Sequence, residues 1–254
     1  MNLAQQSQSL LQKGTRGSGR ITAQSGRLLR LITLFTLVTF LLGAYTGLIY
    51  AGMDTTQGNV QRIFYFHVAS FSACSVAFAA TVVGGIAYLR TRRIGWDRLA
   101  LAGVEVGFSL SLITLITGMV WARPIWNTWW TWDPRLTSAA IMVLVYAAYL
   151  MLRNAIENAD KKRSLASVYG IFAFATVIFT FMVIRIRPDT IHPAVIGASP
   201  QNAEGGFAMT NTMTTALAIN SIVWCCFVAP TLIWWRMRLE GLNEKVERLR
   251  AELQ

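Results

Sequence analysis

Cysteine and histidine are both scarce in this chain of 254 residues, which has three cysteines and two histidines. No C-x-x-C pair occurs, so the sequence excludes disulfide exchange and covalent cofactor attachment through that motif. Cys74, Cys225 and Cys226 all fall within apolar stretches, where a cysteine is typically a small buried hydrophobe. We therefore expect packing roles for all three.

Charged residues are sparse as well. They make up 14% of the chain, against 54% hydrophobic residues, and the mean hydropathy is +0.44. This composition excludes an ordinary soluble domain and is typical of membrane proteins. A bilayer core of roughly 30 Å requires about 20 apolar residues per helix. Six runs of this length occur, near residues 31–50, 63–89, 99–121, 135–152, 165–184 and 213–235. The sequence thus predicts an all-α polytopic membrane protein with six transmembrane helices.

Acidic residues number only 12 against 23 Lys and Arg, and the formal net charge of +11 raises the question of a nucleic-acid partner. The positions of the basic residues argue against one. Of the 23, 18 fall in the N-terminal segment, two alternate loops and the C-terminal tail, and the other loops hold only Arg62, Arg123, Arg135, Arg185 and Arg187. Because Lys and Arg favour cytoplasmic loops, we predict that both termini are cytoplasmic and that nucleic acid is not bound.

The composition divides the chain into three parts. Residues 1–27 are polar and lack apolar periodicity, which predicts a disordered cytoplasmic segment. Residues 28–236 are predicted to form the membrane domain, with an external tryptophan-rich loop at 122–134. Residues 237–254 are predicted to form a cytoplasmic amphipathic helix, because apolar residues recur at spacings of three and four. These residues are Leu239, Leu242, Val246, Leu249 and Leu253.

Tryptophan is concentrated at one place. Five of the nine tryptophans lie within twelve residues, at Trp121, Trp126, Trp129, Trp130 and Trp132. An aromatic belt at the membrane interface is the ordinary explanation. However, Trp126, Trp129 and Trp130 would share one face if the segment is helical, and such a face would suit a flat apolar ligand.

Both histidines fall on the predicted external side with this loop. His67 lies in RIFYFHVASF at the outer start of the second predicted helix, and His192 lies in TIHPAVIG just beyond the fifth. Pro193 favours an extended backbone at His192. Since neutral imidazole is a common metal ligand, the two histidines are candidate ligands of one metal.

The residues that directly follow the last of these tryptophans have competing interpretations. Asp133 and Pro134 are a favoured N-cap and N1 pair, so they can simply start the fourth helix. Arg135 is one of the five external arginines, and its guanidinium suits a ligand that carries carboxylates.

Residues 126–138, WNTWWTWDPRLTS, resemble the tryptophan-rich (WWD) signature of the haem-handling membrane proteins of cytochrome c biogenesis. Within that superfamily, the RLTS ending, the six helices and RIFYFHVASF are similar to the haem exporter protein C family of the cytochrome c maturation system. The resemblance covers roughly residues 30–236.

The resemblance implies that haem b binds non-covalently and transiently at the external face of a bacterial or archaeal cytoplasmic membrane. It implies that His67 and His192 are the axial ligands of the iron. The other candidate haem-binding residues are Trp126, Trp129, Trp130, Trp132, Asp133 and Arg135. Implied partners are a membrane-anchored haem chaperone, an ATP-driven transporter complex and a small helical membrane subunit.

We therefore expect a haem-binding and transfer protein rather than an enzyme. One alternative is a haem lyase that attaches haem to apocytochrome c. A second is a solute or ion permease, whose ionisable residues would line the membrane interior. Glu105 is nearly alone in that position, and we expect it either to reach the cytoplasmic surface or to pair with a basic residue there.

The charge distribution generates a testable topology. Cysteines introduced at Asn127 and Ala194 should react with an impermeant thiol reagent added to intact cells, because both positions are predicted to lie outside. The unsubstituted protein gives the background from the three native cysteines. Labelling that occurs only after lysis would reverse the predicted orientation.

Overall fold

The structure, a computed structural model, describes all residues except 1–25, 188, 196–198, 204–208 and 254. Six of its helices are long and apolar enough to cross a membrane, which confirms the predicted all-α fold with six spans. They are Gly26–Tyr50, Asn59–Thr91, Ile94–Trp126, Pro134–Ala155, Ala159–Ile186 and Asn211–Glu252.

Several spans change helix type along their length. The first span ends in the π-helical segment η1 (Thr46–Tyr50), and the second begins with a short 3-10 turn, η2 (Asn59–Arg62). The next helices are α2 (Ile63–Thr91), α3 (Ile94–Trp126), α4 (Pro134–Ala155) and α5 (Ala159–Ile186). The last span consists of α6 (Asn211–Ile222), the π-helical η3 (Val223–Val228) and α7 (Ala229–Glu252).

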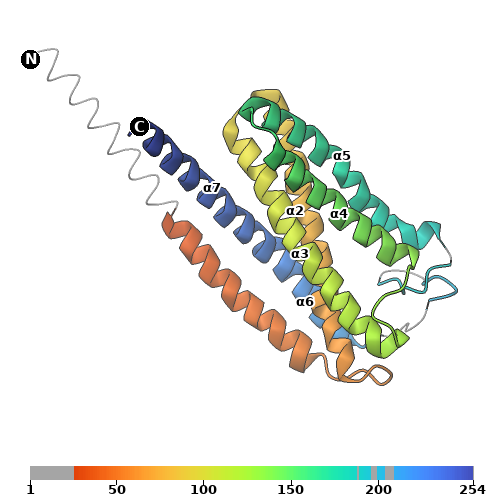
Figure 1. The fold of residues 1–254 in the computed structure, drawn as a ribbon. Coiled ribbons are helices and arrows are strands. Elements are labelled where there is room, and N and C mark those ends of the chain that lie inside the picture. The colour runs from red at the N-terminus through yellow and green to blue at the C-terminus, as the bar shows by residue number, and fades with distance from the viewer. Residues whose placement is uncertain (1–25, 188, 196–198, 204–208, 254) are drawn as a thin grey trace, which may run out of the picture.

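Helix α2 is the centre of the bundle, where it packs against α3, α5, α6 and α7 (Figure 1). Successive helices run antiparallel, so the connections gather at two ends. One end holds the short turns at 92–93 and 156–158, together with the start of the first span and the end of α7. The other end holds the connections at 51–58 and 127–133 and the long one between α5 and α6. We call this second end the pocket end.

Small residues let α2 and α3 approach closely. A Cβ atom on Gly103 would lie 2.6 Å from the carbonyl oxygen of Ala77, and one on Gly84 would lie 2.7 Å from that of Trp96. Lipid supplies no hydrophobic force between helices, so close van der Waals packing at small residues is what holds such a pair together. This contact fixes α2 and α3 as the rigid frame of the molecule.

Ion pairs gather at the end opposite the pocket end. Arg153 of α4 makes two hydrogen bonds to Asp97 of α3, at 2.8 and 2.7 Å, and both residues are buried. Glu105 pairs with Arg236 of α7 at 2.5 Å, which confirms the expected pairing of this carboxylate. These pairs tie α4 and α7 to α3.

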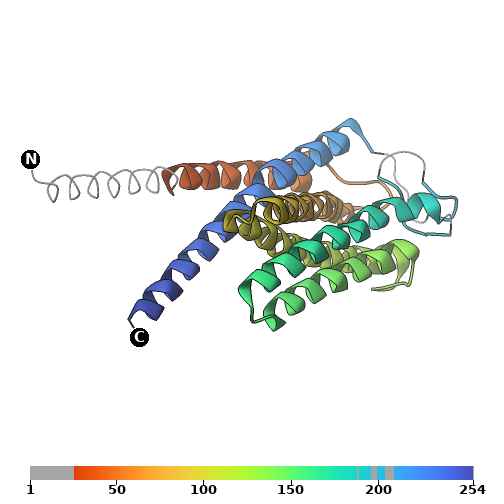
Figure 2. The ribbon, with the colours of Figure 1, turned by 90° about the horizontal axis from the view of Figure 1, so that it is seen from above.

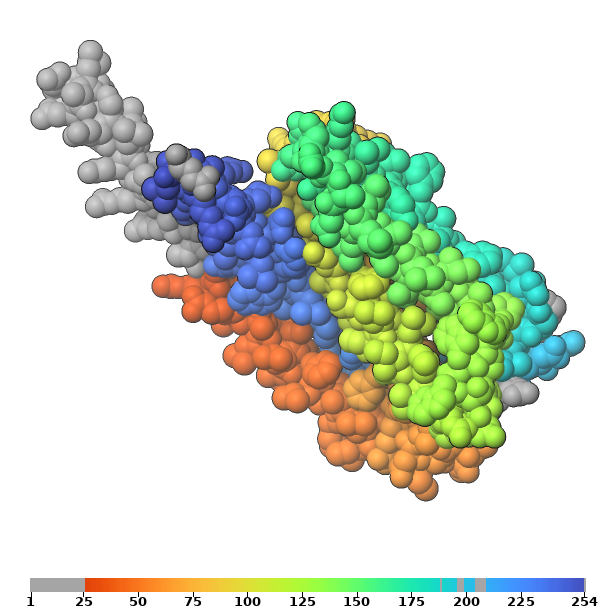
Figure 3. Space-filling view, viewed as in Figure 1, coloured from red at the N-terminus to blue at the C-terminus, as the bar shows by residue number. Residues whose placement is uncertain are grey.

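The first span lies along α6 and α7 at one flank of the molecule (Figures 2 and 3). The hydroxyls of Thr36 and Thr231 are 2.9 Å apart, and the indole of Trp235 donates to Thr33 Oγ1 at 2.7 Å. Asn220 of α6 donates to the carbonyl oxygen of Gly43 at 3.0 Å. The opposite side of the first span is apolar and exposed, as a surface in contact with lipid should be.

The two terminal segments predicted from the sequence can be compared with the helices of the structure. Residues 1–25 of the predicted disordered segment lie outside the described residues, whereas Gly26 and Arg27 already belong to the first helix. At the other end α7 runs without a break from Ala229 to Glu252, so the tail helix is a continuation of the last span. The apolar positions Leu239, Leu242, Val246 and Leu249 are about half exposed, and Leu253, which follows the helix, is 88% exposed. The side of the membrane on which either terminus lies stays a prediction.

Candidate functional site

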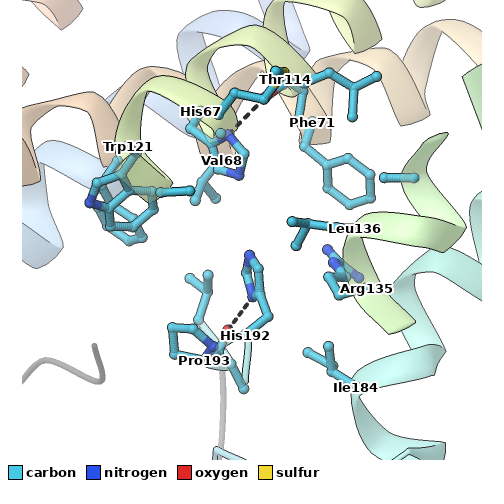
Figure 4. Close-up of a pocket in the computed structure, with 18 of the residues that line it drawn as sticks. His67, Val68, Phe71, Thr114, Trp121, Arg135, Leu136, Ile184, His192 and Pro193 are labelled. Carbon is cyan, nitrogen blue, oxygen red and sulfur yellow. Dashed lines mark hydrogen bonds between the residues drawn. The ribbon is translucent and has the colours of Figure 1, made fainter. Parts of the chain in front are cut away.

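A pocket of about 280 Å³ opens at the pocket end (Figure 4). This volume is near the lower limit of ligand pockets, which run from roughly 300 to 1,000 Å³. Its walls come from α2, α3, α4, α5, residues 192–195, Gln57 and Trp130, and most of the lining side chains are apolar. The polar side chains that reach it include His67, His192, Arg135 and Arg185.

His67 lies in the second turn of α2 and is oriented by α3. Its Nδ1 atom is 3.1 Å from the carbonyl oxygen of Thr114 and 3.2 Å from Thr117 Oγ1. A carbonyl oxygen can only accept, so Nδ1 carries the hydrogen and a neutral imidazole keeps its lone pair on Nε2. The free side of the ring faces the pocket (Figure 4).

Gly118 gives the His67 ring its space. A Cβ atom at this position would lie 2.9 Å from His67 Cε1. The neighbouring Trp121 packs edge-on to the imidazole at 5.8 Å between ring centroids, and its indole donates to Gln57 Oε1 at 3.0 Å. The ring of His67 is therefore held from three sides by groups of α3.

His192 comes from the connection between α5 and α6 and enters the pocket from the other side (Figure 4). Its Nδ1 atom is 2.8 Å from the carbonyl oxygen of Pro193, so this imidazole too presents Nε2 to the pocket. Trp126 packs edge-on to the ring at 6.2 Å. Burial, together with the nearby charge of Arg135, lowers the pKa of His192 to about 4.

Asp133 does not line the pocket but joins two of its walls. Its carboxylate accepts a hydrogen bond from the backbone N–H of Arg135 at 2.7 Å, which confirms the predicted N-cap of α4. It also accepts from the hydroxyl of Thr190, at 2.9 and 2.7 Å, and from the N–H of Ile191 at 2.8 Å. The residue is 7% exposed.

Arg135 lines the pocket through its guanidinium group. The guanidinium carbon lies 4.7 Å from the ring centroid of Phe71, and Nη1 donates to the carbonyl oxygen of Thr180. Aromatic packing and a backbone carbonyl thus hold the cation in place.

The four tryptophans that were expected to contact the ligand fall into two pairs in the structure. Trp126 and Trp130 line the pocket, whereas Trp129 and Trp132 do not and are 54% and 81% exposed. Helix α3 extends to Trp126 and ends at Asn127, whose φ is +55°. Residues 128–133 are not helical, so the shared helical face that would join Trp126 to Trp129 and Trp130 is not formed.

Thr114, Gly118 and Thr190 contribute to the site but were not expected from the sequence. Thr114 acts through its backbone carbonyl, which every residue possesses, and Gly118 acts through the absence of a side chain. The sequence offers one indication for Thr190, since its hydroxyl lies two residues before the candidate ligand His192. Its hydrogen-bond partner Asp133, however, is 57 positions away. Only the folded chain brings them together.

Comparison with known proteins places the chain close to one family. The sequence model of the family described as "Heme exporter protein C" matches residues 15–252. The Heme exporter protein C of Haemophilus influenzae is 30% identical over 235 residues, which are 88% of this chain and 88% of that protein.

Two further relatives match over a shorter part. The protein of the same name from Rhodobacter capsulatus is 35% identical over 144 residues, which are 57% of this chain and 60% of the relative. The one from Paracoccus denitrificans is 36% identical over 164 residues, which are 63% of this chain and 66% of the relative. The chain thus spans less than two thirds of the length of these two relatives.

The lowered pKa of His192 has a measurable consequence. The imidazole of His192 should stay neutral from neutral pH to about pH 5 and protonate near pH 4. NMR can follow this titration, and the variant His67→Gln assigns the signals of the two histidines. The pKa of a histidine in an unfolded chain is about 6.5. Between these values only the unfolded chain binds the proton, so the free energy of unfolding should fall as the pH drops from about 6.5 towards 4. A midpoint near 6.5 in the folded protein would contradict the burial.

Proposed function

Because the chain belongs to the Heme exporter protein C family, we propose that it binds haem in this pocket and delivers it for cytochrome c maturation. One observation carries the proposal. Two imidazoles from distant parts of the chain enter one apolar pocket, and each has its Nδ1 bonded to a backbone carbonyl and its Nε2 available. That is the arrangement in which histidines serve as metal ligands with a fixed tautomer.

The lining supports haem b as a non-covalently held cargo. His67 and His192 would ligate the iron, and the half-buried Trp126 and Trp130 would supply apolar contact to the ring. Arg135 presents a cation to the pocket, as the carboxylates of the porphyrin require. In this proposal the chain positions haem and does not make or break its bonds.

The protein holds the two proposed iron ligands by different contacts. This difference indicates which histidine leaves the iron first. His67 is held between α2 and α3, the rigid frame of the molecule. His192 lies on a connection whose described residues form no helix or strand. We therefore expect His192 to leave the iron first when haem passes to its acceptor.

The acceptor in this proposal is a membrane-anchored haem chaperone. An ATP-driven transporter complex and a small helical membrane subunit are the proposed assisting partners. With the predicted topology the pocket end faces outward from the cytoplasmic membrane, so the transfer takes place on the external side.

Histidine replacement tests the proposal. The purified protein should show a Soret band, and His67→Ala and His192→Ala should each lower haem occupancy and give a five-coordinate spectrum. Added imidazole should partly restore the six-coordinate spectrum, since each variant lacks a single axial ligand. The double replacement should be nearly haem-free, and His67→Ala should lose more haem than His192→Ala.

A His192→Ala protein with the wild-type spectrum and normal delivery would remove this residue from the site. Covalent attachment of haem to an apocytochrome by the purified protein alone would instead favour a haem lyase.

The division of the tryptophans gives a matched pair of variants. Replacing Trp126 and Trp130 by Ala should weaken haem binding about tenfold or more, because loss of one buried aromatic contact costs roughly 1.5–3 kcal/mol. Replacing the exposed Trp129 and Trp132 should change the affinity less than about threefold, since a scattered exposed side chain contributes little burial. Haem titration followed by absorbance measures both. Equal losses in the two double variants would show that the whole loop, and not the pocket wall, holds the ring.

A further inference from the structure

We infer that Asp133 is a positioning residue that holds His192 opposite His67 by clamping the backbone and side chain of the preceding two residues. The inference rests on the proposed function of the pocket, because it assigns a task within that site. It gives the aspartate of the tryptophan-rich segment a role away from the bound ligand.

The two carboxylate oxygens of Asp133 have different partners. Oδ1 accepts the N–H of Arg135 at 2.7 Å, which starts α4, and also faces the Thr190 hydroxyl at 2.9 Å. Oδ2 accepts from the Thr190 hydroxyl at 2.7 Å and from the N–H of Ile191 at 2.8 Å. A helix cap requires one oxygen only, so Oδ2 serves the ligand-bearing connection alone.

The clamp reaches His192 through Thr190. The N–H of His192 is 3.2 Å from Thr190 Oγ1, the same hydroxyl that donates to Asp133. Thr190 is fully buried and Asp133 nearly so. Hydrogen bonds to an ionised carboxylate are roughly twice as strong as neutral ones, and burial protects them from competing water.

The same carboxylate therefore connects three parts of the site. It ends the tryptophan segment, starts the helix that carries Arg135 and fixes the backbone immediately before His192. His67 needs no such device, since two helices already hold it. The position of the second imidazole depends on a single charged group.

Asp133→Asn separates the clamp from the helix cap. Asn is as good an N-cap as Asp, so its amide oxygen can keep the bond to Arg135. Its NH2 group would then face the N–H of Ile191, where a donor meets a donor. Thr190→Val removes the hydroxyl at nearly constant volume, and Thr190→Ser keeps it. Asp189→Asn is the matched control, because this neighbouring carboxylate is exposed and pairs with Arg187.

The first measurement uses the haem-free protein. Hydrogen exchange at the Ile191 amide should be slow in the wild type and in Asp189→Asn. It should become at least tenfold faster in Asp133→Asn, and faster also in Thr190→Val. Thr190→Ser should behave as the wild type.

The second measurement uses the haem-loaded protein. Asp133→Asn and Thr190→Val should shift the spectrum from six-coordinate towards five-coordinate, and haem should dissociate about 10–100-fold faster, as is typical when a group that orients a metal ligand is lost. Added imidazole should restore the six-coordinate spectrum in both variants, which a general loss of folding would not allow. Thr190→Ser and Asp189→Asn should keep the wild-type spectrum.

The outcomes distinguish the inference from the function on which it rests. Unchanged exchange and an unchanged spectrum in Asp133→Asn and Thr190→Val, with a six-coordinate wild type, would refute the clamp and leave the pairing of the histidines intact. A wild type that binds haem without six-coordination would refute that pairing, and with it the role of Asp133 towards a ligand.

Discussion

The carbonyl oxygens of Thr114 and Pro193 each accept a hydrogen bond from an imidazole Nδ1, and the character of the pocket depends on these two bonds. They place the hydrogen of each neutral ring on Nδ1 and leave the Nε2 lone pair for a ligand. The space around one ring comes from Gly118 and its orientation from α3, so the close packing of α2 on α3 is part of the site. A shift of α2 against α3 would change the direction in which His67 enters the pocket.

The supports of the two rings differ in kind. Close packing between α2 and α3, together with the hydrogen bond to Thr114, holds His67 in a densely packed part of the molecule. A few hydrogen bonds hold His192, and these can open locally without disturbing the bundle. Under the proposed function, this difference would let the site bind haem and then release it.

Hydropathy and charge were sufficient to predict the six spans, because the length of an apolar run reports directly on the thickness of the bilayer. The start of α4 at Asp133 and Pro134 could also be predicted, since capping depends on adjacent residues. The division of the tryptophans into lining and exposed side chains could not be predicted. It follows from the end of α3 at Asn127, beyond which the spacing of three and four no longer puts side chains on one face. Asp133 bonds to Thr190, 57 positions away, and His67 bonds to Thr114, 47 positions away. A local sequence pattern cannot predict such distant partners.

Asp133 differs from the carboxylates that pair with arginines at the other end of the bundle. At the end opposite the pocket, Asp97 and Glu105 neutralise arginines of neighbouring helices. At the pocket end Asp133 accepts hydrogen bonds from uncharged donors, and within the described part of the chain Arg135 forms no ion pair. Its guanidinium is held by Phe71 and the carbonyl oxygen of Thr180, neither of which cancels its charge. Arg135 therefore presents its positive charge at the pocket wall, where a carboxylate of the proposed haem would pair with it.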